Sequence, residues 1–330
     1  MTTLEQKNIS LGLVGAGYWG KNLVRVFNTL GVLKKVCDCN TEVISQVKKD
    51  YPEISVVQDF NNLLEDRELV GIVIASPAVS HYELAKKALI AGKHVFVEKP
   101  LALKVQHGEE LVALAKDKEL VLMVGHLLLY HPAIVKLKEM IKSGDLGEIR
   151  YIYSNRLNFG KLRTEENVLW SFAPHDIAIV LDFLGMPKSV NCLGKDFLQK
   201  NIPDVTLTFL EFDNNQAAHI FVSWLNPFKE QKLSIIGSLK MAVFDGVLNQ
   251  LSVFEHKVQT NGSNFIQAMP GQAQAIDFGN EEPLMQEAKH FLESIQENKT
   301  PLSDGKEALA VLRVLEGSQK SLEEGTKIVL

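Results

Sequence analysis

Residues 11–20 read LGLVGAGYWG, a short apolar run followed by three glycines spaced G-x-G-x-x-G. The run has the composition of a strand buried on both faces, and the residues after it have helical periodicity. In such a strand–turn–helix unit Gly15 makes the tight turn, Gly17 lets a pyrophosphate approach the backbone, and Gly20 lets the helix pack on the strand. The stretch therefore predicts the phosphate-binding turn of a dinucleotide cofactor.

This stretch opens a series of strand–helix repeats. Four more short apolar runs occur at 34–39, 71–76, 93–98 and 120–125, with helices expected at 19–30, 41–49, 80–91 and 104–118. Strands of this composition belong to parallel sheets that are covered by helices on both faces. We therefore expect an α/β protein whose residues 1–125 form a Rossmann domain with a doubly wound parallel sheet.

The pattern changes in the second part of the chain. Strand-like segments such as VTLTFLEF (205–212) and AAHIFVSWL (217–225) follow one another, with the turn residues Asp213-Asn214-Asn215 between them. Residues 126–330 are therefore expected to form an α+β domain with a large open, mostly antiparallel sheet. Residues 258–281 look like a long loop. Two closing helices, at 283–297 and 304–323, can pack back on the Rossmann domain.

Composition narrows the class of protein. The chain has 330 residues, 46% of them hydrophobic, and a net charge of −5, which favours neither nucleic acid nor an anionic membrane as a partner. No apolar run reaches the roughly 18 residues of a membrane span, and the N-terminus has no signal-peptide pattern. Three cysteines at irregular spacing predict neither disulfides nor zinc. We therefore expect a cytoplasmic protein that binds no metal.

The residue after the second strand bears on the choice of cofactor. Asp38 lies about twenty residues past the glycine motif, where a carboxylate can accept hydrogen bonds from the adenosine ribose hydroxyls. The same carboxylate would repel a 2′-phosphate, and residues 39–41 supply no cation. The sequence therefore predicts NAD rather than NADP. An alternative role for Asp38, as the cap of the helix at 41–49, stays open.

The strand at 94–100 reads HVFVEKP and ends in two opposite charges and a proline. Ligands of doubly wound sheets bind beyond the carboxyl ends of the strands. There the Lys99 ammonium can meet a substrate hydroxyl beside the nicotinamide, Glu98 can orient Lys99 or tune its basicity, and Pro100 forces a turn at a bond where a cis peptide costs little. The alternative is that Lys99 is an ordinary surface lysine. The expected cofactor contacts are Gly15, Gly17, Tyr18, Trp19, Gly20, Asp38, Ser76, Pro77, His81, Glu98, Lys99 and Pro100.

Several of these features occur together in one family. The glycine motif, the SP…H pattern of residues 76–81, EKPLAL (98–103) and the closing segment 282–325 resemble the Gfo/Idh/MocA oxidoreductases. The resemblance implies a Rossmann domain, a second domain with a large open sheet, a nicotinamide cofactor and hydride transfer at a sugar or cyclitol carbinol. It also implies that Lys99 is the catalytic lysine.

The family's second catalytic element, a helix beginning D-x-G-x-H, is matched by WSFAPHD (170–176). His175 fits the histidine, whereas Ala173 and Ser171 replace the glycine and the aspartate. An imidazole can take the hydroxyl proton as a general base because its ordinary pKa lies near neutral pH. Without the aspartate, either His175 or Lys99 accepts the proton. Asp176 is expected to cap the helix, and a purely structural role for His175 is the alternative.

A basic stretch suggests the kind of substrate. Residues 150–163 contain Arg150, Arg156, Lys161 and Arg163 but no acidic residue, which suits a substrate with phosphates or a carboxylate. A solvated strand flank is the alternative. Asn158 and Trp170 can add a polar contact and a stacking wall, and His126 can line the site. The expected substrate contacts are Lys99, His126, Arg156, Asn158, Lys161, Arg163, Trp170 and His175.

The run GKLRTEENVLWSFAPHDI (160–177) resembles the nucleotide-sugar branch of the family, which includes UDP-N-acetylglucosaminuronate 3-dehydrogenases. That resemblance implies NAD-dependent oxidation at C3 of a UDP-linked N-acetylhexosamine or its uronate, in surface-polysaccharide biosynthesis. The alternatives are a dehydrogenase or reductase of a free sugar or cyclitol, and a non-catalytic nicotinamide-binding regulator, which should lack Lys99 and His175. The free face of the sheet is expected to pair subunits in a homo-dimer or homo-tetramer.

Overall fold

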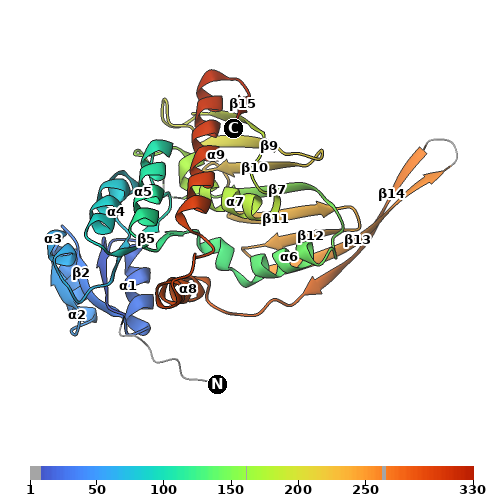
Figure 1. Cartoon of the computed structure of the whole chain (residues 1–330). Coiled ribbons are helices and arrows are strands. Elements are labelled where there is room, and N and C mark those ends of the chain that lie inside the picture. The colour runs from blue at the N-terminus through green and yellow to red at the C-terminus, as the bar shows by residue number, and fades with distance from the viewer. Residues whose placement is uncertain (1–8, 161, 262–264) are drawn as a thin grey trace. The chain divides into compact units, whose positions relative to one another are not determined.

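The structure, a computed structural model, describes residues 9–160, 162–261 and 265–330 (Figure 1). The chain forms two compact units. The Rossmann unit comprises Met1–Tyr130 and Glu282–Leu312, and the sheet unit comprises His131–Glu281 and Arg313–Leu330. No helix in the described ranges is long and apolar enough to cross a lipid bilayer.

The Rossmann unit contains a six-stranded parallel sheet in the order β3-β2-β1-β4-β5-β6. This confirms the doubly wound sheet expected from the sequence. The sequence prediction lacked β3, which is a short, incompletely buried edge strand. The strands are β1 (Leu11–Val14), β2 (Leu33–Cys37), β3 (Ser55–Val57), β4 (Gly71–Ile74), β5 (His94–Glu98) and β6 (Leu122–Gly125). The helices are α1 (Gly20–Thr29), α2 (Thr41–Asp50), α3 (Asn61–Leu64), η1 (Ala78–Ser80), α4 (His81–Ile90), α5 (Val105–Asp117), η2 (Leu127–Tyr130), α8 (Pro283–Glu297) and the first part of α9 (Gly305–Glu324).

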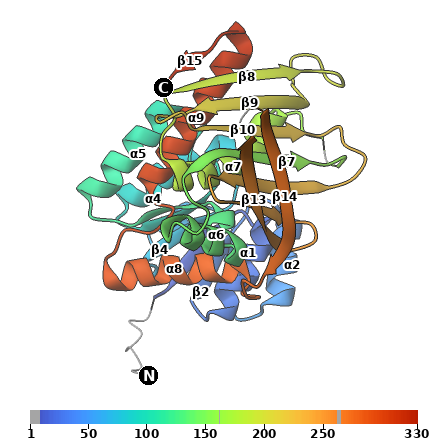
Figure 2. The ribbon, with the colours of Figure 1, turned by 90° about the vertical axis from the view of Figure 1, so that its right-hand side faces the viewer.

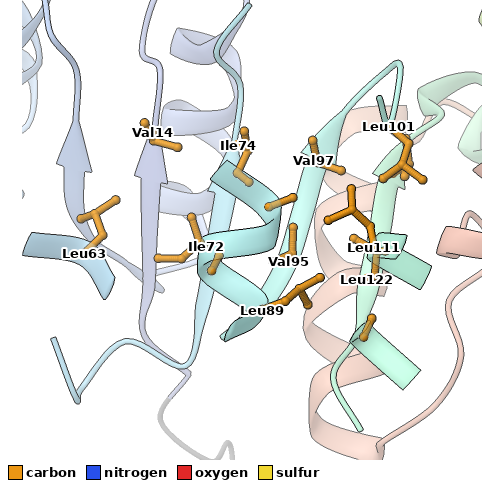
Figure 3. Close-up of a cluster of buried hydrophobic side chains, with 14 of the residues drawn as sticks. Val14, Leu63, Ile72, Ile74, Leu89, Val95, Val97, Leu101, Leu111 and Leu122 are labelled. Atoms are coloured by element: carbon orange, nitrogen blue, oxygen red, sulfur yellow. The ribbon is translucent and has the colours of Figure 1, made fainter. Parts of the chain in front are cut away.

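Helices cover both faces of this sheet, which explains why its central strands read as unbroken apolar runs. On one face the side chains of β4 and β5, among them Ile72 and Val95, pack against Leu89 of α4 and Leu111 of α5 (Figure 3). On the other face the rings of Phe27 (α1), Phe96 (β5) and Phe291 (α8) meet edge to face, with centroids 5.7–6.4 Å apart. The return segment Glu282–Leu312 is therefore an integral layer of the Rossmann unit.

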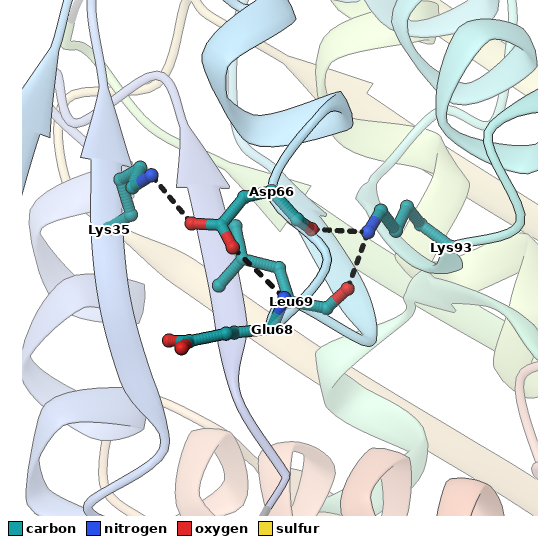
Figure 4. A network of polar contacts seen from close by, with 5 residues as sticks. All are labelled: Lys35, Asp66, Glu68, Leu69 and Lys93. Atoms are coloured by element: carbon teal, nitrogen blue, oxygen red, sulfur yellow. Dashed lines mark hydrogen bonds and ion pairs between the residues drawn. The ribbon is translucent and has the colours of Figure 1, made fainter.

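A polar network fixes the amino end of the sheet (Figure 4). Lys93 is only 6% exposed, and its ammonium donates to the backbone carbonyls of Asp66 and Leu69, each at 2.6 Å. Burial lowers the pKa of Lys93, and the hydrogen bond from Lys35 lowers the pKa of Asp66. These contacts hold the segments before β4 and β5 against β2.

The sheet unit contains a nine-stranded sheet in the order β14-β13-β12-β11-β7-β10-β9-β8-β15 (Figure 2). Every neighbouring pair is antiparallel except β7 and β10, so the expected mostly antiparallel sheet is confirmed. Its strands are β7 (Ile149–Leu157), β8 (Ser189–Lys195), β9 (Val205–Glu211), β10 (Ala217–Ser223), β11 (Glu230–Gly237), β12 (Lys240–Asp245), β13 (Gln250–Asn261), β14 (Phe265–Ile276) and β15 (Ile328–Val329). Its helices are α6 (Pro132–Lys142), α7 (Val168–Leu184) and the last part of α9 (Gly305–Glu324).

The expected long loop at 258–281 is wrong over most of its length. β13 and β14 pair antiparallel from Leu251↔Ile276 to Asn261↔Phe265, with a bulge between Phe254 and His256. Backbone hydrogen bonds hold such a two-stranded ribbon, so its side chains need not be apolar. The abundance of Gln, Gly and Ala in this stretch therefore resembled a loop.

Candidate active site

The glycine-rich turn after β1 is closed on its inner side and open on its outer side. Gly15 has a φ of +88°, and a Cβ there would lie 2.6 Å from the Ser76 nitrogen. A Cβ on Gly20 would lie 1.9 Å from the Gly15 carbonyl oxygen, whereas a Cβ on Gly17 would meet no atom within 4 Å. Gly15 and Gly20 thus permit the turn, and Gly17 leaves the backbone accessible in front of the N-terminus of α1. This geometry fits the pyrophosphate of a dinucleotide.

Asp38 follows β2 and lies against the same turn. Its Oδ2 accepts a hydrogen bond from the Ala16 nitrogen at 2.8 Å, and its Oδ1 accepts one from the Asn40 nitrogen at 2.9 Å. Asp38 does not cap α2, because the N-cap is Asn40, whose side chain accepts from the Glu42 nitrogen. Each carboxylate oxygen has a second lone pair, so Asp38 can still accept hydrogen bonds from ribose hydroxyls.

Ser76, Pro77 and His81 form the turn between β4 and α4. The Ser76 and Ser80 hydroxyls are 2.7 Å apart. The His81 ring is 1% exposed, with Nδ1 2.8 Å from the Pro100 carbonyl oxygen and Nε2 2.8 Å from the Ser76 carbonyl oxygen. His81 therefore supports this turn from within. Direct contact between His81 and the cofactor stays a prediction.

The β5 tip, residues 98–100, ends the next strand of the sheet. The Glu98 side chain is buried, and its Oε1 accepts a hydrogen bond from the indole nitrogen of Trp19 at 2.5 Å. Gly125 makes room for it, because a Cβ there would lie 3.1 Å from the carboxyl atoms. Burial raises the pKa of Glu98, and the Trp19 hydrogen bond and the Lys99 charge oppose the rise. Lys99 joins Pro100 through a cis peptide bond.

Two acidic residues of the return segment complete this end of the Rossmann unit. Glu287, on α8, is fully buried, and no hydrogen-bond partner is present for either of its carboxyl oxygens among the described residues. Burial, together with the nearby Glu98 carboxyl, raises the pKa of Glu287 well above its ordinary value. His126 is 1% exposed, and its Nδ1 lies 2.6 Å from Oε2 of Glu307. His126 is thus engaged inside the unit, and its contact with substrate stays a prediction.

The sequence analysis missed Glu287, although the sequence did contain a signal for it. Leu284, Ala288 and Phe291 are buried positions of α8, and Glu287 lies on the same helical face. A carboxyl placed among apolar residues at this spacing indicates a perturbed acid.

In the sheet unit, His175 lies in the second turn of α7. This helix begins at Val168, and its N-cap Asn167 accepts a hydrogen bond from the Trp170 nitrogen. The expectation that Asp176 caps the helix is therefore wrong. Asp176 is 2% exposed and accepts hydrogen bonds from the Ser154 hydroxyl at 2.6 Å and from Arg156 at 2.6 and 3.1 Å. These bonds anchor the His175 segment of α7 on β7.

The basic stretch is less basic than its sequence indicated. Arg156 pairs with Asp176, and Arg163 forms an ion pair with Glu166 at 2.8 Å, so acids beyond the stretch partly neutralise it. Trp170 donates its indole N–H to Gln319 at 3.1 Å. The Asn158 backbone nitrogen bonds to the Ser223 carbonyl oxygen. Lys161 lies outside the described residues. Contact of these residues with substrate stays a prediction.

No cluster of three or more His, Cys, Asp or Glu side chains that could hold a metal ion occurs among the described residues. The three cysteines are free, Cys37 and Cys192 being buried and Cys39 exposed.

Both domains of the chain are similar to known proteins. A model described as an oxidoreductase family with an NAD-binding Rossmann fold matches residues 9–126, and a model of the GFO/IDH/MocA C-terminal domain matches residues 134–243. A UDP-N-acetylglucosamine 3-dehydrogenase from Acidithiobacillus ferrooxidans is 25% identical over 89% of this chain and 91% of its own. Its solved structure has a TM-score of 0.84 at 23% identity, over 96% of this chain and 98% of that chain. The scyllo-inositol 2-dehydrogenase (NAD(+)) of Bacillus subtilis is 26% identical over 97% of this chain and 95% of its own.

Proposed function

The chain belongs to the Gfo/Idh/MocA oxidoreductase family, and from this premise we propose that it oxidises C3 of a UDP-linked N-acetylhexosamine or its uronate, with NAD as acceptor. The observation that carries the proposal is the β5 tip, where Lys99 follows a buried Glu98 at the carboxyl end of a strand near the open Gly17 turn. The end-to-end similarity to a UDP-N-acetylglucosamine 3-dehydrogenase supports the nucleotide sugar.

The proposed reaction removes two hydrogens from one carbinol. When NAD is bound, its nicotinamide supplies the hydride acceptor. His175 or Lys99 takes the hydroxyl proton, and the Lys99 ammonium stabilises the negative charge that develops on the oxygen. The products are a 3-keto sugar, reduced cofactor and one proton. In this proposal Trp19 and Glu98 position Lys99 through the partly buried hydrogen bond at the β5 tip.

Preference for NAD is assigned to Asp38. Its carboxylate lies beside the Ala16 amide, where it can accept bonds from ribose hydroxyls and repel a 2′-phosphate. In this proposal Arg163 and Lys161 bind the diphosphate or uronate, together with Asn158, Trp170 and His126, and Arg156 contributes the part of its guanidinium that Asp176 leaves available. The product would enter surface-polysaccharide biosynthesis in the cytoplasm.

We also propose that the open face of the large sheet pairs two subunits in a homo-dimer or homo-tetramer. Leu193, Leu207 and Phe209 lie on one face of β8 and β9 and are 58%, 40% and 37% exposed. The opposite face carries the buried Cys192 and Leu210. An apolar sheet face exposed in this way is typical of a protein–protein interface.

Oxidation of a free cyclitol is the second candidate, because the scyllo-inositol dehydrogenase is 26% identical over 97% of this chain, whereas the UDP-N-acetylglucosamine 3-dehydrogenase is 25% identical over 89% of it. The deciding experiment incubates the purified protein with NAD and, separately, UDP-N-acetylglucosamine, its uronate, N-acetylglucosamine and scyllo-inositol, and follows the absorbance of reduced cofactor. We expect NAD to be reduced with a UDP sugar, and to be reduced little with N-acetylglucosamine or scyllo-inositol. Turnover of scyllo-inositol alone would favour the second candidate, and cofactor binding without any reduction would favour a non-catalytic regulator.

A further inference from the structure

His81 joins three segments of the Rossmann unit with one ring. It is the first residue of α4, and its two nitrogens contact the backbone carbonyls of Ser76, after β4, and Pro100, after β5, each at 2.8 Å. Ser76 in turn lies so close to Gly15 that a Cβ there would be 2.6 Å from the Ser76 nitrogen. The ring is 1% exposed, and its contact with the Pro100 carbonyl is buried and that with the Ser76 carbonyl partly buried, so water competes poorly for both nitrogens.

The protons of these two contacts can be counted. A backbone carbonyl has no proton to donate, and a neutral imidazole carries only one N–H. With a neutral ring, one nitrogen lone pair would point at a carbonyl oxygen in a buried site, which is unfavourable. Only the imidazolium, with both nitrogens protonated, donates to both oxygens.

We propose that His81 is held as an imidazolium that clamps the ends of β4 and β5 together and thereby positions Lys99. The proposal rests on the proposed function for its catalytic consequence, because Lys99 immediately precedes Pro100. Loss of the proton removes one of the two hydrogen bonds. It would release either the Ser76 turn, which borders the glycine-rich turn, or the β5 tip.

Other charges around the ring act in both directions. The positive end of the α4 dipole and the Lys99 ammonium disfavour the protonated form of His81. An ionised Glu98 carboxylate favours that form. The remaining titratable groups on the helices α4 and α5 are Tyr82, Glu83, Lys86 and Lys87 on α4 and His107, Glu109, Glu110, Lys116 and Asp117 on α5. The two buried carbonyl acceptors are the feature that specifically requires both protons.

The direct test uses the wild-type protein with ¹⁵N-labelled histidine side chains. The His81 signals are assigned by their loss in His81→Gln, and nitrogen chemical shifts report whether each ring nitrogen carries a proton. We expect both nitrogens to be protonated between about pH 6 and 8, where an ordinary histidine loses one proton. A folded protein with one unprotonated His81 nitrogen at pH 6 would overturn the proposal.

A second measurement tests the clamp itself by titrating NAD into His81→Gln and into the control His107→Gln. His107 stacks on the Tyr82 ring of α4, with centroids 3.8 Å apart, and bridges neither β4 nor β5, so its replacement should leave NAD affinity unchanged. His81→Gln should weaken NAD binding by about tenfold, the size of one lost hydrogen bond to a charged group. It should also lower kcat by roughly 10- to 100-fold through misplacement of Lys99.

The two measurements separate the clamp from the proposed function. Wild-type affinity and kcat in His81→Gln would refute the clamp. If wild type oxidises no sugar, the proposed function fails, while the nitrogen shifts and the NAD titration still decide the protonation and the clamp.

Discussion

Replacing Asp176 with alanine should lower the unfolding free energy of the sheet unit far more than a substitution at an exposed position. The Asp176 side chain is 3% exposed and that of Arg156 is 13% exposed, and their two hydrogen bonds are 2.6 and 3.1 Å long. The variant leaves a nearly buried guanidinium without its carboxylate and the Ser154 hydroxyl without its acceptor. Breaking a buried ion pair from one side costs about 3–5 kcal/mol of unfolding free energy.

The double variant Arg156→Met with Asp176→Leu separates stability from chemistry. Apolar replacement of both partners is often neutral, so its unfolding free energy should return to within about 1–2 kcal/mol of wild type. If Arg156 binds substrate, the double variant should still show a raised KM for the UDP sugar although its fold is restored. An unchanged KM would assign Arg156 to anchoring α7 alone.

Urea unfolding followed by tryptophan fluorescence suits this test, because Trp170 and Trp224 both lie in the sheet unit. Asp176→Asn keeps the volume and one carbonyl acceptor and should fall between wild type and the alanine variant. If Asp176→Ala loses less than about 1 kcal/mol of unfolding free energy, the size expected of an exposed ion pair, the Arg156–Asp176 pair does not act as a buried one.

Three further predictions address other parts of the molecule. Burial raises the pKa of Glu287, so the contribution of this group to the unfolding free energy is full below its unfolded pKa of about 4.3 and is lost as pH rises through its folded pKa. In urea unfolding, the unfolding free energy of Glu287→Gln should therefore increase relative to that of wild type as pH rises from 5 to 8. Parallel pH profiles of the two proteins would count against a buried acid. Asp38→Ser should narrow the NAD/NADP ratio of kcat/KM, and an unmoved ratio would remove Asp38 from cofactor selection. If wild type forms the proposed oligomer in light scattering, Phe209→Glu should reduce its mass to that of a monomer, whereas the exposed control Leu248→Lys should not. An unchanged mass for both variants would place the interface elsewhere.

The sequence predicted those parts of the fold that depend on burial between near neighbours. Strands β1, β4, β5 and β6 are almost wholly buried, so each reads as an apolar run, whereas β2 (LKKVC) carries an exposed Lys34. The edge strand β3 has three residues, one of them exposed, and gives no such pattern. Strands β13 and β14 pair through backbone hydrogen bonds, which no side-chain pattern announces, and the composition of this stretch indicated a loop instead.

The residues of the candidate site likewise fall into those that the sequence could predict and those that it could not. The glycine motif and the β5 tip could be recognised because each is a short local pattern whose position at a strand end follows from the fold. The pairing of Arg156 with Asp176 joins residues 20 positions apart on a strand and a helix, and only the register between these elements creates it. The His81 bridge depends in the same way on two turns meeting in space.

The role of Lys99 as the group that activates a sugar hydroxyl is tested most directly by one comparison. NAD reduction by UDP-N-acetylglucosamine or its uronate is measured for wild type and Lys99→Met, with NAD affinity determined for both. We predict reduced cofactor with wild type, a kcat lower by about 10²- to 10⁴-fold in the variant, and similar NAD affinity. Comparable turnover by Lys99→Met would contradict the account.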